Sequence, residues 1–345
     1  MSLDQELNRA VRTAYVGLNR TVIDRTHALP KMLLKRARKN ILVGNTIEFD
    51  IWYERLPTGA YGPYQPLPTR VRESTAQGTL RFRNYAATLQ IDGPTLRANS
   101  GINIGQIMNI DSIRELPSKQ TAETLFNILD EQMQRAIKDL TWTLGTHMYG
   151  DGSANSNQAL TGTVAIVNNS TASYAGLVPT DFENDDVTSN SWWTPQVLAN
   201  SGTNRAMTLE LIRRMSTSVR RGDEQDEDIV CVMNNNLWEE LQGILEGSKT
   251  YESDTLHSIG VENVKYQYIT FIRDPMARNN EMLFLNLNHL YMQVRPSADF
   301  LFDGFKQDPS VDGVVAHIIG DCQVVCDDRH RQGLLDDIAG ANDTL

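Results

Sequence analysis

The feature that most constrains the fold is a long apolar periodicity between Ser118 and Gly152. Apolar residues recur there at intervals of three and four, as on one face of an α-helix. Ser118 is a candidate N-cap, and Gly150 and Gly152 are stop signals. The pattern predicts a single helix of roughly 30 residues, about 45 Å long. The apolar positions are Ala122, Leu125, Leu129, Met133, Ala136, Ile137, Leu140, Leu144 and Met148.

Such a helix depends on packing along its apolar stripe, because surface ion pairs add only tenths of a kcal/mol each. The chain has 345 residues, of which 40% are hydrophobic and 22% charged, enough for two or three substructures. It contains no run of 18 apolar residues, and its N-terminus lacks the apolar core of a signal peptide. Three cysteines do not make a disulfide framework. We therefore predict a globular cytosolic product that is neither secreted nor membrane-bound.

Charge is distributed unevenly along the chain. The formal net charge of −11 argues against a sequence-reading nucleic-acid protein. Residues 1–40 are nevertheless basic, with helical patterns near 4–15 and 31–40, whereas 181–186 and 223–228 are acidic. Opposite patches on one chain suggest copies that attract each other. The basic arm has three interpretations: it packs on its own domain, lies on a neighbouring subunit, or contacts nucleic acid.

Two segments alternate between apolar and polar residues and predict strands, one at 45–53 and one at 79–91. Prolines and glycines between them exclude a continuous helix. The result is a long two-stranded arm, which needs support because an isolated hairpin is marginal in water. Its aromatic and arginine residues are typical of interfaces, although the arm could fold back on its own chain. The candidate inter-subunit residues are Trp52, Tyr53, Arg55, Tyr61, Tyr64, Arg70, Arg72, Arg81 and Arg83 on the arm, with Lys35, Arg36 and Arg38 on the basic segment.

The second half of the chain predicts a compact α/β domain followed by returning strands. We expect a strand at 160–167, a helix at 207–221, a buried strand at 229–233 and a strand at 264–272. Asn236 is the expected N-cap of a helix that ends near Gly247. Strands at 281–295 and 313–326 are long and apolar enough to cover the long helix. Cys322 and Cys326 fall on one face of the last strand and are expected to be buried.

The sequence contains no recognised catalytic or phosphate-binding motif, and its six histidines lack metal-ligand spacing. The acidic run 181–186 departs from a calcium loop at the positions of the glycine and the final glutamate. We therefore expect no enzyme activity, no cofactor and no metal. A remaining enzyme hypothesis is a carbohydrate site built from Asp181, Glu183, Trp192 and Trp193.

The order of these parts resembles the major capsid proteins of tailed bacteriophages, which have the Hong Kong 97-type fold. The residues that carry the resemblance are THMYGDGSAN at 146–155, LTG at 160–162 and NSWWTPQVL at 190–198. The resemblance implies an α+β capsid fold with an N-terminal arm at 1–40 and an extended loop at 41–100. It further implies a peripheral domain with the spine helix at 101–155, an axial domain at 156–280, and peripheral return strands at 281–345.

The function implied by this resemblance is self-assembly, as pentamers and hexamers, into an icosahedral shell around double-stranded DNA. Expected partners are other copies of the chain, a separate scaffolding protein, a portal complex, a decoration or cement protein, and non-specifically packaged DNA, with no membrane. The expected location is the virion capsid, and the host cytoplasm during assembly.

One departure from the family concerns covalent crosslinking. In crosslinking members a lysine on the extended loop joins a neighbour's asparagine, but this chain has no lysine between Lys39 and Lys119. We therefore expect a shell without that link. The alternative with the same fold is an encapsulin-like compartment, which holds enzyme cargo instead of a genome.

Overall fold

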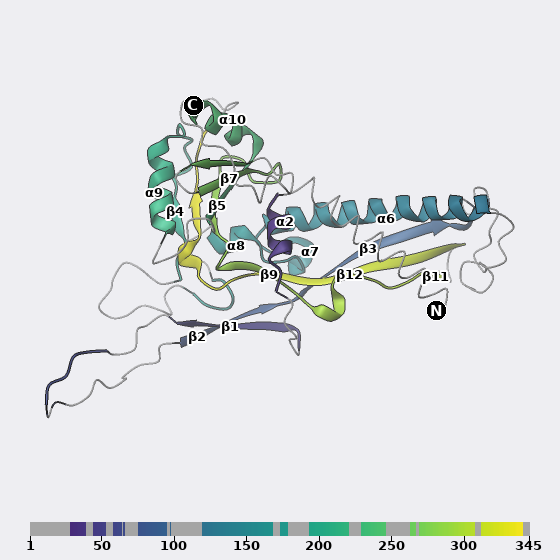
Figure 1. Ribbon diagram of the computed structural model, residues 1–345, viewed down its shortest axis with the longest axis horizontal. Coiled ribbons are helices and arrows are strands. Elements are labelled where there is room, and N and C mark those ends of the chain that lie inside the picture. The colour runs from purple at the N-terminus through teal and green to yellow at the C-terminus, as the bar shows by residue number, and fades with distance from the viewer. Residues whose placement is uncertain are drawn as a thin grey trace.

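The computed structural model describes residues 28–38, 44–52, 58–63, 65, 75–94, 97, 119–167, 173–178, 193–220, 229–245, 263–266, 269–307 and 312–340, with side chains in the long helix described from Gln132 onward. The architecture is mixed α+β, as expected (Figure 1). The predicted helix at 4–15, both acidic runs, and the candidate residues Tyr53, Arg55, Tyr64, Arg70 and Arg72 lie outside the described residues.

The predicted long helix is present as α6, Lys119–Met148, which has 30 residues. Its described apolar positions, from Met133 to Met148, are buried, whereas Arg135, Lys138 and Trp142 are exposed. The buried stripe packs against β3, Arg83–Asp92, and Figure 1 shows the helix running alongside β3 and β12. The helix is therefore stabilised by tertiary burial, as its length requires.

A five-stranded sheet forms around β12, Gly313–Cys326. One end of β12 pairs antiparallel with β3, from Gly313 opposite Asp92, and the other end pairs with β9, Leu290–Val294. The short strands β10, Leu301–Phe302, and β11, Lys306–Gln307, also pair with it. The predicted strand at 313–326 is confirmed, and so is the burial of Cys322 and Cys326.

A six-stranded sheet has the order β4-β13-β8-β5-β7-β6. Its strands are β4, Gln196–Leu198; β13, Gly333–Leu335; β8, Met282–Asn286; β5, Ile229–Met233; β7, Ile269–Arg273; and β6, Asn263–Tyr266. Two segments that were each predicted as one strand contain two strands in the structure. Residues 264–272 form the antiparallel pair β6 and β7, and residues 281–295 form β8 and β9. Because β8 and β9 belong to different sheets, the tail contributes to both sheets and does not only cover the long helix.

Residues on β5 alternate between two apolar cores. Cys231 and Met233 face a cluster that contains α9, Leu209–Val219, and α10, Asn235–Leu245, whereas Val230 and Val232 face the core shared with α6. The predicted helix at 207–221 is confirmed. The expected cap of α10 is wrong by two residues, because Asn234 supplies the oxygen that accepts from the N–H of Leu237, at 2.9 Å.

One further prediction needs correction, and one open alternative is decided for the described residues. Residues 160–167 do not form a strand, because Thr163–Val167 is the helix α8, preceded by a short helix α7 at Ala154–Asn157. The last turn of α8 is held by Arg329, whose Nε donates to the carbonyl of Ile166 at 2.9 Å. The basic segment forms α2, Ala28–Lys35, which buries Leu29 and Leu33 in the core of its own chain. The described part of residues 1–40 therefore packs on its own domain.

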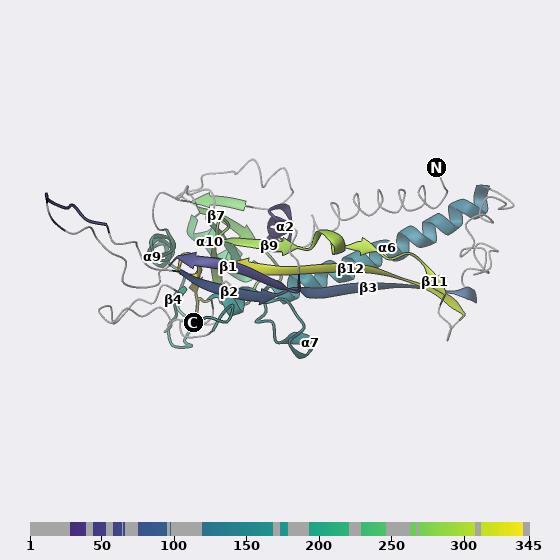
Figure 2. The ribbon, with the colours of Figure 1, turned by 90° about the horizontal axis from the view of Figure 1, so that it is seen from below.

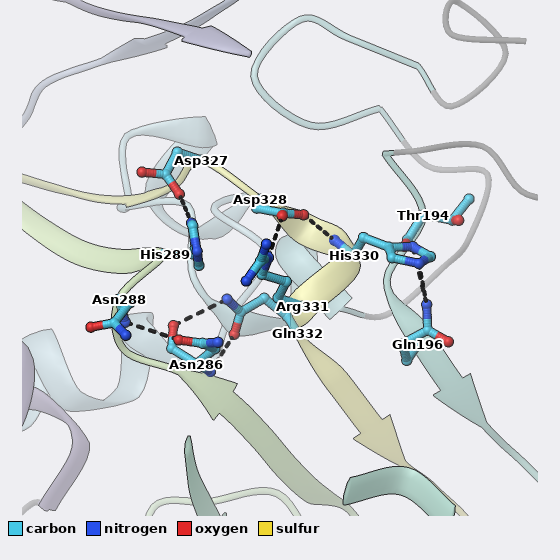
Figure 3. A network of polar contacts seen from close by, with 10 residues as sticks. All are labelled: Thr194, Gln196, Asn286, Asn288, His289, Asp327, Asp328, His330, Arg331 and Gln332. Carbon is cyan, nitrogen blue, oxygen red and sulfur yellow. Dashed lines mark hydrogen bonds and ion pairs between the residues drawn. The ribbon is translucent and has the colours of Figure 1, made fainter. Parts of the chain in front are cut away.

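Two turns connect the sheets and are bound to each other (Figure 3). The β8–β9 turn contains His289, and its Nδ1 lies 2.7 Å from Oδ1 of Asp327, at the end of β12. Gln332, just before β13, accepts from the N–H of Asn286 at 2.9 Å and donates to its carbonyl at 3.2 Å. Because each turn leads from one sheet to the other, these contacts fix how the sheets meet.

The turn after β12 is also bound internally and to β4. The carboxylate of Asp328 accepts from the N–H of His330 at 3.0 Å and from Nε of Arg331 at 2.8 Å. The His330 ring in turn contacts the carbonyl of Thr194 and the amide of Gln196 (Figure 3). We infer that this network makes the junction between the sheets rigid.

Truncating one side chain of the buried stripe should show how far α6 depends on packing. We expect Ile137→Ala to lower the free energy of unfolding by about 2–5 kcal/mol, because it removes a fully buried side chain. The matched control is Lys138→Ala, at the next and exposed position of the same helix, with an effect of about 0.5 kcal/mol or less. Urea unfolding of unassembled chains measures both, and equal effects would contradict the assigned helix orientation.

The His289–Asp327 contact should make stability depend on pH. Burial by itself would lower the pKa of His289, but the hydrogen bond and negative charge of Asp327 outweigh burial and raise it. The contact therefore stabilises fully below the usual histidine pKa of about 6.5, and its contribution is lost as pH rises through the raised pKa. We expect Asp327→Asn to lower Tm by a few degrees at about pH 6 and by less at about pH 9.

Calorimetry of unassembled wild-type and variant chains across this range measures the Tm difference. His289→Asn is the control, because Asp327→Asn made on that background should lose its pH dependence. A Tm difference that does not change with pH would contradict the protonated pair.

Candidate assembly interface

The predicted arm is present as an antiparallel pair of strands, β1, Thr46–Trp52, and β2, Thr75–Arg81. Its first strand matches the predicted 45–53, but its second does not match 79–91, because β2 ends at Arg81 and β3 continues into the other sheet. The described segment 58–63 lies well apart from the rest of the molecule in both Figure 1 and Figure 2. The segment 58–63 therefore does not pack against the body of its own chain.

The two faces of the arm differ in character. Ile47, Ile51 and Leu80 are buried on the inner face. Phe49 packs across Gly78, where a Cβ would lie 2.6 Å from the phenyl ring, so this register requires glycine. The outer face is exposed and carries Glu48, Asp50, Trp52, Gln77 and Arg81. Only one face of the arm is thus covered by its own chain.

Buried aromatic residues attach the base of the arm to the body. The Trp193 ring lies 6.5 Å from Phe49 and 6.0 Å from Tyr174, and its Nε1 donates to the Tyr174 carbonyl at 3.2 Å. The Thr79 N–H donates to the Ala175 carbonyl at 2.8 Å. Burial raises the pKa of the Tyr174 phenol, which stays neutral and accepts from a backbone N–H of β12.

Arg295 holds the other side of the base. Its guanidinium pairs with Asp321 at 2.8 Å, donates to the Gly44 carbonyl at 2.8 Å, and lies over the Phe82 ring at 4.7 Å. Because Gly44 precedes β1 and Phe82 follows β2, one side chain binds both ends of the hairpin. The arm has a fixed base, and its outer face is exposed.

The described candidate residues fall into two groups. Trp52 is 78% exposed, Tyr61 is 65% exposed, and Arg81, Lys35 and Arg36 are also exposed. Arg83 is half-buried, and the Arg38 guanidinium stacks 3.5 Å above the Tyr291 ring of its own chain. The structure therefore places Trp52, Tyr61 and Arg81 on the arm, and Lys35, Arg36 and Arg38 at or just after the end of α2.

Sequence reasoning missed one exposed aromatic residue. Trp142 on α6 is 57% exposed and lies on the same helix face as Arg135 and Lys138. Its position is outside the apolar periodicity of the helix, and that mismatch is the sequence signal that identifies it.

The titratable groups of the described core have structural roles. Tyr85 accepts from the N–H of Leu160 at 3.0 Å and donates to Nδ1 of His147 at 2.9 Å. Burial lowers the pKa of His147, so this ring is neutral near pH 7. Burial also raises the pKa of Cys322 to about 12, which leaves an unreactive thiol.

The structure gives little support to other kinds of site. Trp193 is buried and cannot offer a ring face to a sugar, so the carbohydrate hypothesis loses one of its two aromatic residues; Asp181, Glu183 and Trp192 lie outside the described residues. No group of three or more potential metal ligands occurs among the described side chains. Within the same part of the chain, no helix is long and apolar enough to cross a membrane.

Comparison with known proteins gives matches in structure only. No family model and no curated protein matches the sequence. The capsid asymmetric unit of cyanophage A-1(L) superposes with a TM-score of 0.66 at 16% identity, covering 90% of this chain and 92% of that one. The capsid of a native GTA particle gives 0.55 at 10% identity, over 89% and 90% of the two chains. The holo-SrpI encapsulin complex from Synechococcus elongatus gives 0.50 at 9% identity, over 92% and 90%.

The likeness to the cyanophage capsid extends over nine-tenths of both chains. The chain therefore has the Hong Kong 97-type fold of the major capsid proteins of tailed bacteriophages.

Proposed function

We propose that this chain is the shell subunit of a tailed-bacteriophage head. Copies assemble as pentamers and hexamers into an icosahedral capsid that encloses double-stranded DNA. The observation that carries the proposal is an arm fixed at its base but uncovered along its outer face, on a chain that resembles a cyanophage capsid subunit over 90% of its length. Large exposed aromatic residues on such an arm are typical of the residues that contribute most of the binding energy at protein–protein interfaces.

In this proposal the arm lies on a neighbouring copy. A contact between two different surfaces of identical chains closes into a ring when its rotation is suitable. Trp52, Tyr61 and Arg81 are the described anchors, and the other candidate residues proposed to contact the neighbour are Tyr53, Arg55, Tyr64, Arg70, Arg72 and Arg83. The exposed Lys35 and Arg36, with Arg38, form a second, basic contact.

The domain boundaries are part of the proposal. Residues 1–40 are the N-terminal arm, 41–100 the extended loop, 101–155 the peripheral domain with α6, 156–280 the axial domain, and 281–345 the peripheral return. Sheet membership crosses the boundary at 280, because β8 and β13 belong to the six-stranded sheet. Two strands from the C-terminal part of the chain thus join the sheet of the proposed axial domain.

The shell is held together without the lysine-mediated link. The region 40–118 contains no lysine, so apolar contacts, arginine pairs and a cement protein would replace a covalent bond. The remaining partners are a separate scaffolding protein, a portal complex, and DNA bound through its phosphates without sequence preference. The capsid forms in the host cytoplasm and remains in the virion.

An encapsulin-like compartment has the same fold and is the second candidate, supported by the weaker structural likeness to the encapsulin shell. Shells purified from the natural source distinguish the two functions. Ultraviolet absorbance typical of nucleic acid, with tails seen by electron microscopy, supports the phage head. Untailed shells that hold protein cargo would overturn it in favour of the compartment.

Removing the exposed aromatic residues tests the role of the arm. We expect Trp52→Ala with Tyr61→Ala to reduce shell yield at least about tenfold, because each truncated anchor costs about 1–2 kcal/mol at every contact. Circular dichroism of the unassembled chain should be unchanged, since both side chains are exposed. Shells are counted by sedimentation and electron microscopy.

The control is Leu301→Ala, an exposed apolar residue of β10 away from the arm, which should assemble normally. A wild-type yield from the double variant would show that the arm does not carry the contact. A wild-type chain that stays monomeric under every salt condition would overturn the shell function itself.

A further inference from the structure

The two helices on the outer side of the six-stranded sheet have exposed faces of opposite charge. The exposed positions of α9 include Arg213 and Arg214, with Glu210 as the single acidic residue of that helix. The exposed or half-exposed positions of α10 include Glu239 and Glu240, and α10 contains no basic residue. One helix face is thus cationic and the other anionic.

These faces lie at two different places on the surface of the same domain. Helix α9 packs against β4, β13 and β8, which form one half of the sheet. Helix α10 follows β5 in the chain and buries Trp238 in the apolar cluster that also contains α9 residues, Val264 of β6 and Phe271 of β7. Figure 1 accordingly shows α9 beside β4 and α10 beside β7.

The chain does not pair these charges with each other. Within the part of the molecule that the structure describes, Arg213, Arg214, Glu239 and Glu240 form no ion pair. In a ring of identical subunits, every contact joins one surface of a copy to a different surface of the next, so two faces of opposite charge can meet there.

We propose that α9 of one copy docks against α10 of the next copy around each ring, with Arg213 and Arg214 facing Glu239 and Glu240. This inference rests on the proposed shell function and specifies which surfaces meet within pentamers and hexamers. The occupant of the cationic face is a second copy of this chain, because the complementary anionic face is built into the same domain. Arginine is suited to this role, since its planar guanidinium binds carboxylates in a bidentate manner.

The proposal predicts that charge reversal on either face prevents ring closure. Arg213→Glu with Arg214→Glu places four acidic side chains face to face, and Glu239→Arg with Glu240→Arg places four basic ones. Each pair of substitutions alone should reduce shell yield at least about tenfold, because like charges placed opposite each other oppose association. The four substitutions together restore complementarity and should restore both rings and shells.

Mixing the two reversed chains gives a sharper test. In an alternating ring every contact again joins opposite charges, so the mixture should form six-membered rings. A five-membered ring cannot alternate and keeps one like-charge contact. We therefore expect native mass spectrometry of the mixture to show hexamers without pentamers, and electron microscopy to show tubes or sheets in place of closed shells.

Arg213→Lys with Arg214→Lys is the control, which keeps the charge and should assemble, and thermal unfolding checks that every variant folds. Wild-type yield from both reversed pairs, or pentamers as frequent as hexamers in the mixture, would overturn this inference while wild-type shells leave the proposed function standing. If the wild-type chain forms no rings or shells, the proposed function and this inference fail together.

Discussion

The pairing of β12 with two different strands determines how the rest of the molecule is arranged. The first part of its 14 residues pairs with β3, which leads out of the arm and supports α6. Its second part pairs with β9 and then enters the turn that leads into the six-stranded sheet. A single extended backbone thus sets the positions of the arm, the long helix and the second sheet. Displacing it would disturb all three, which explains the buried apolar and polar contacts along it.

The rigid base of the arm lowers the entropic cost of any contact that its exposed outer face makes. A flexible arm would lose conformational entropy each time it bound a neighbour, and this loss would weaken the contact. Arg295 and Trp193 fix both ends of the hairpin before any partner arrives. In the proposed assembly, the exposed Trp52 would then gain burial energy with a smaller ordering cost, so the base would matter as much as the anchor residues.

The sequence pattern predicted the long periodic helices and strands well, but it did not predict where a strand is interrupted or where a short helix forms. The pattern of α6 was clear because nine apolar positions kept one period, whereas the break between β2 and β3 depends on a change of parity. Leu80 and Phe82 are followed by Tyr85, Leu89 and Ile91, so the buried positions change from even to odd at this point. The helix α8 was missed because its last carbonyls are satisfied by Arg329, which is 163 residues away from Ile166 in the chain. The aromatic residues of the arm could be identified from the composition of its sequence. Their exposure could not, because it depends on how residues far away in the chain hold the base of the arm.

A net charge of −11 means that approaching copies repel each other at long range. At physiological salt this repulsion is screened beyond about 8 Å, so association depends on what the surfaces offer at contact. Exposed aromatic residues supply burial, which is insensitive to salt, and separate cationic and anionic faces supply attraction only in one orientation. In the proposed assembly, the net negative charge would discourage random aggregation, and the facing charges of α9 and α10 would select the ring contact from the many ways in which two identical chains can meet.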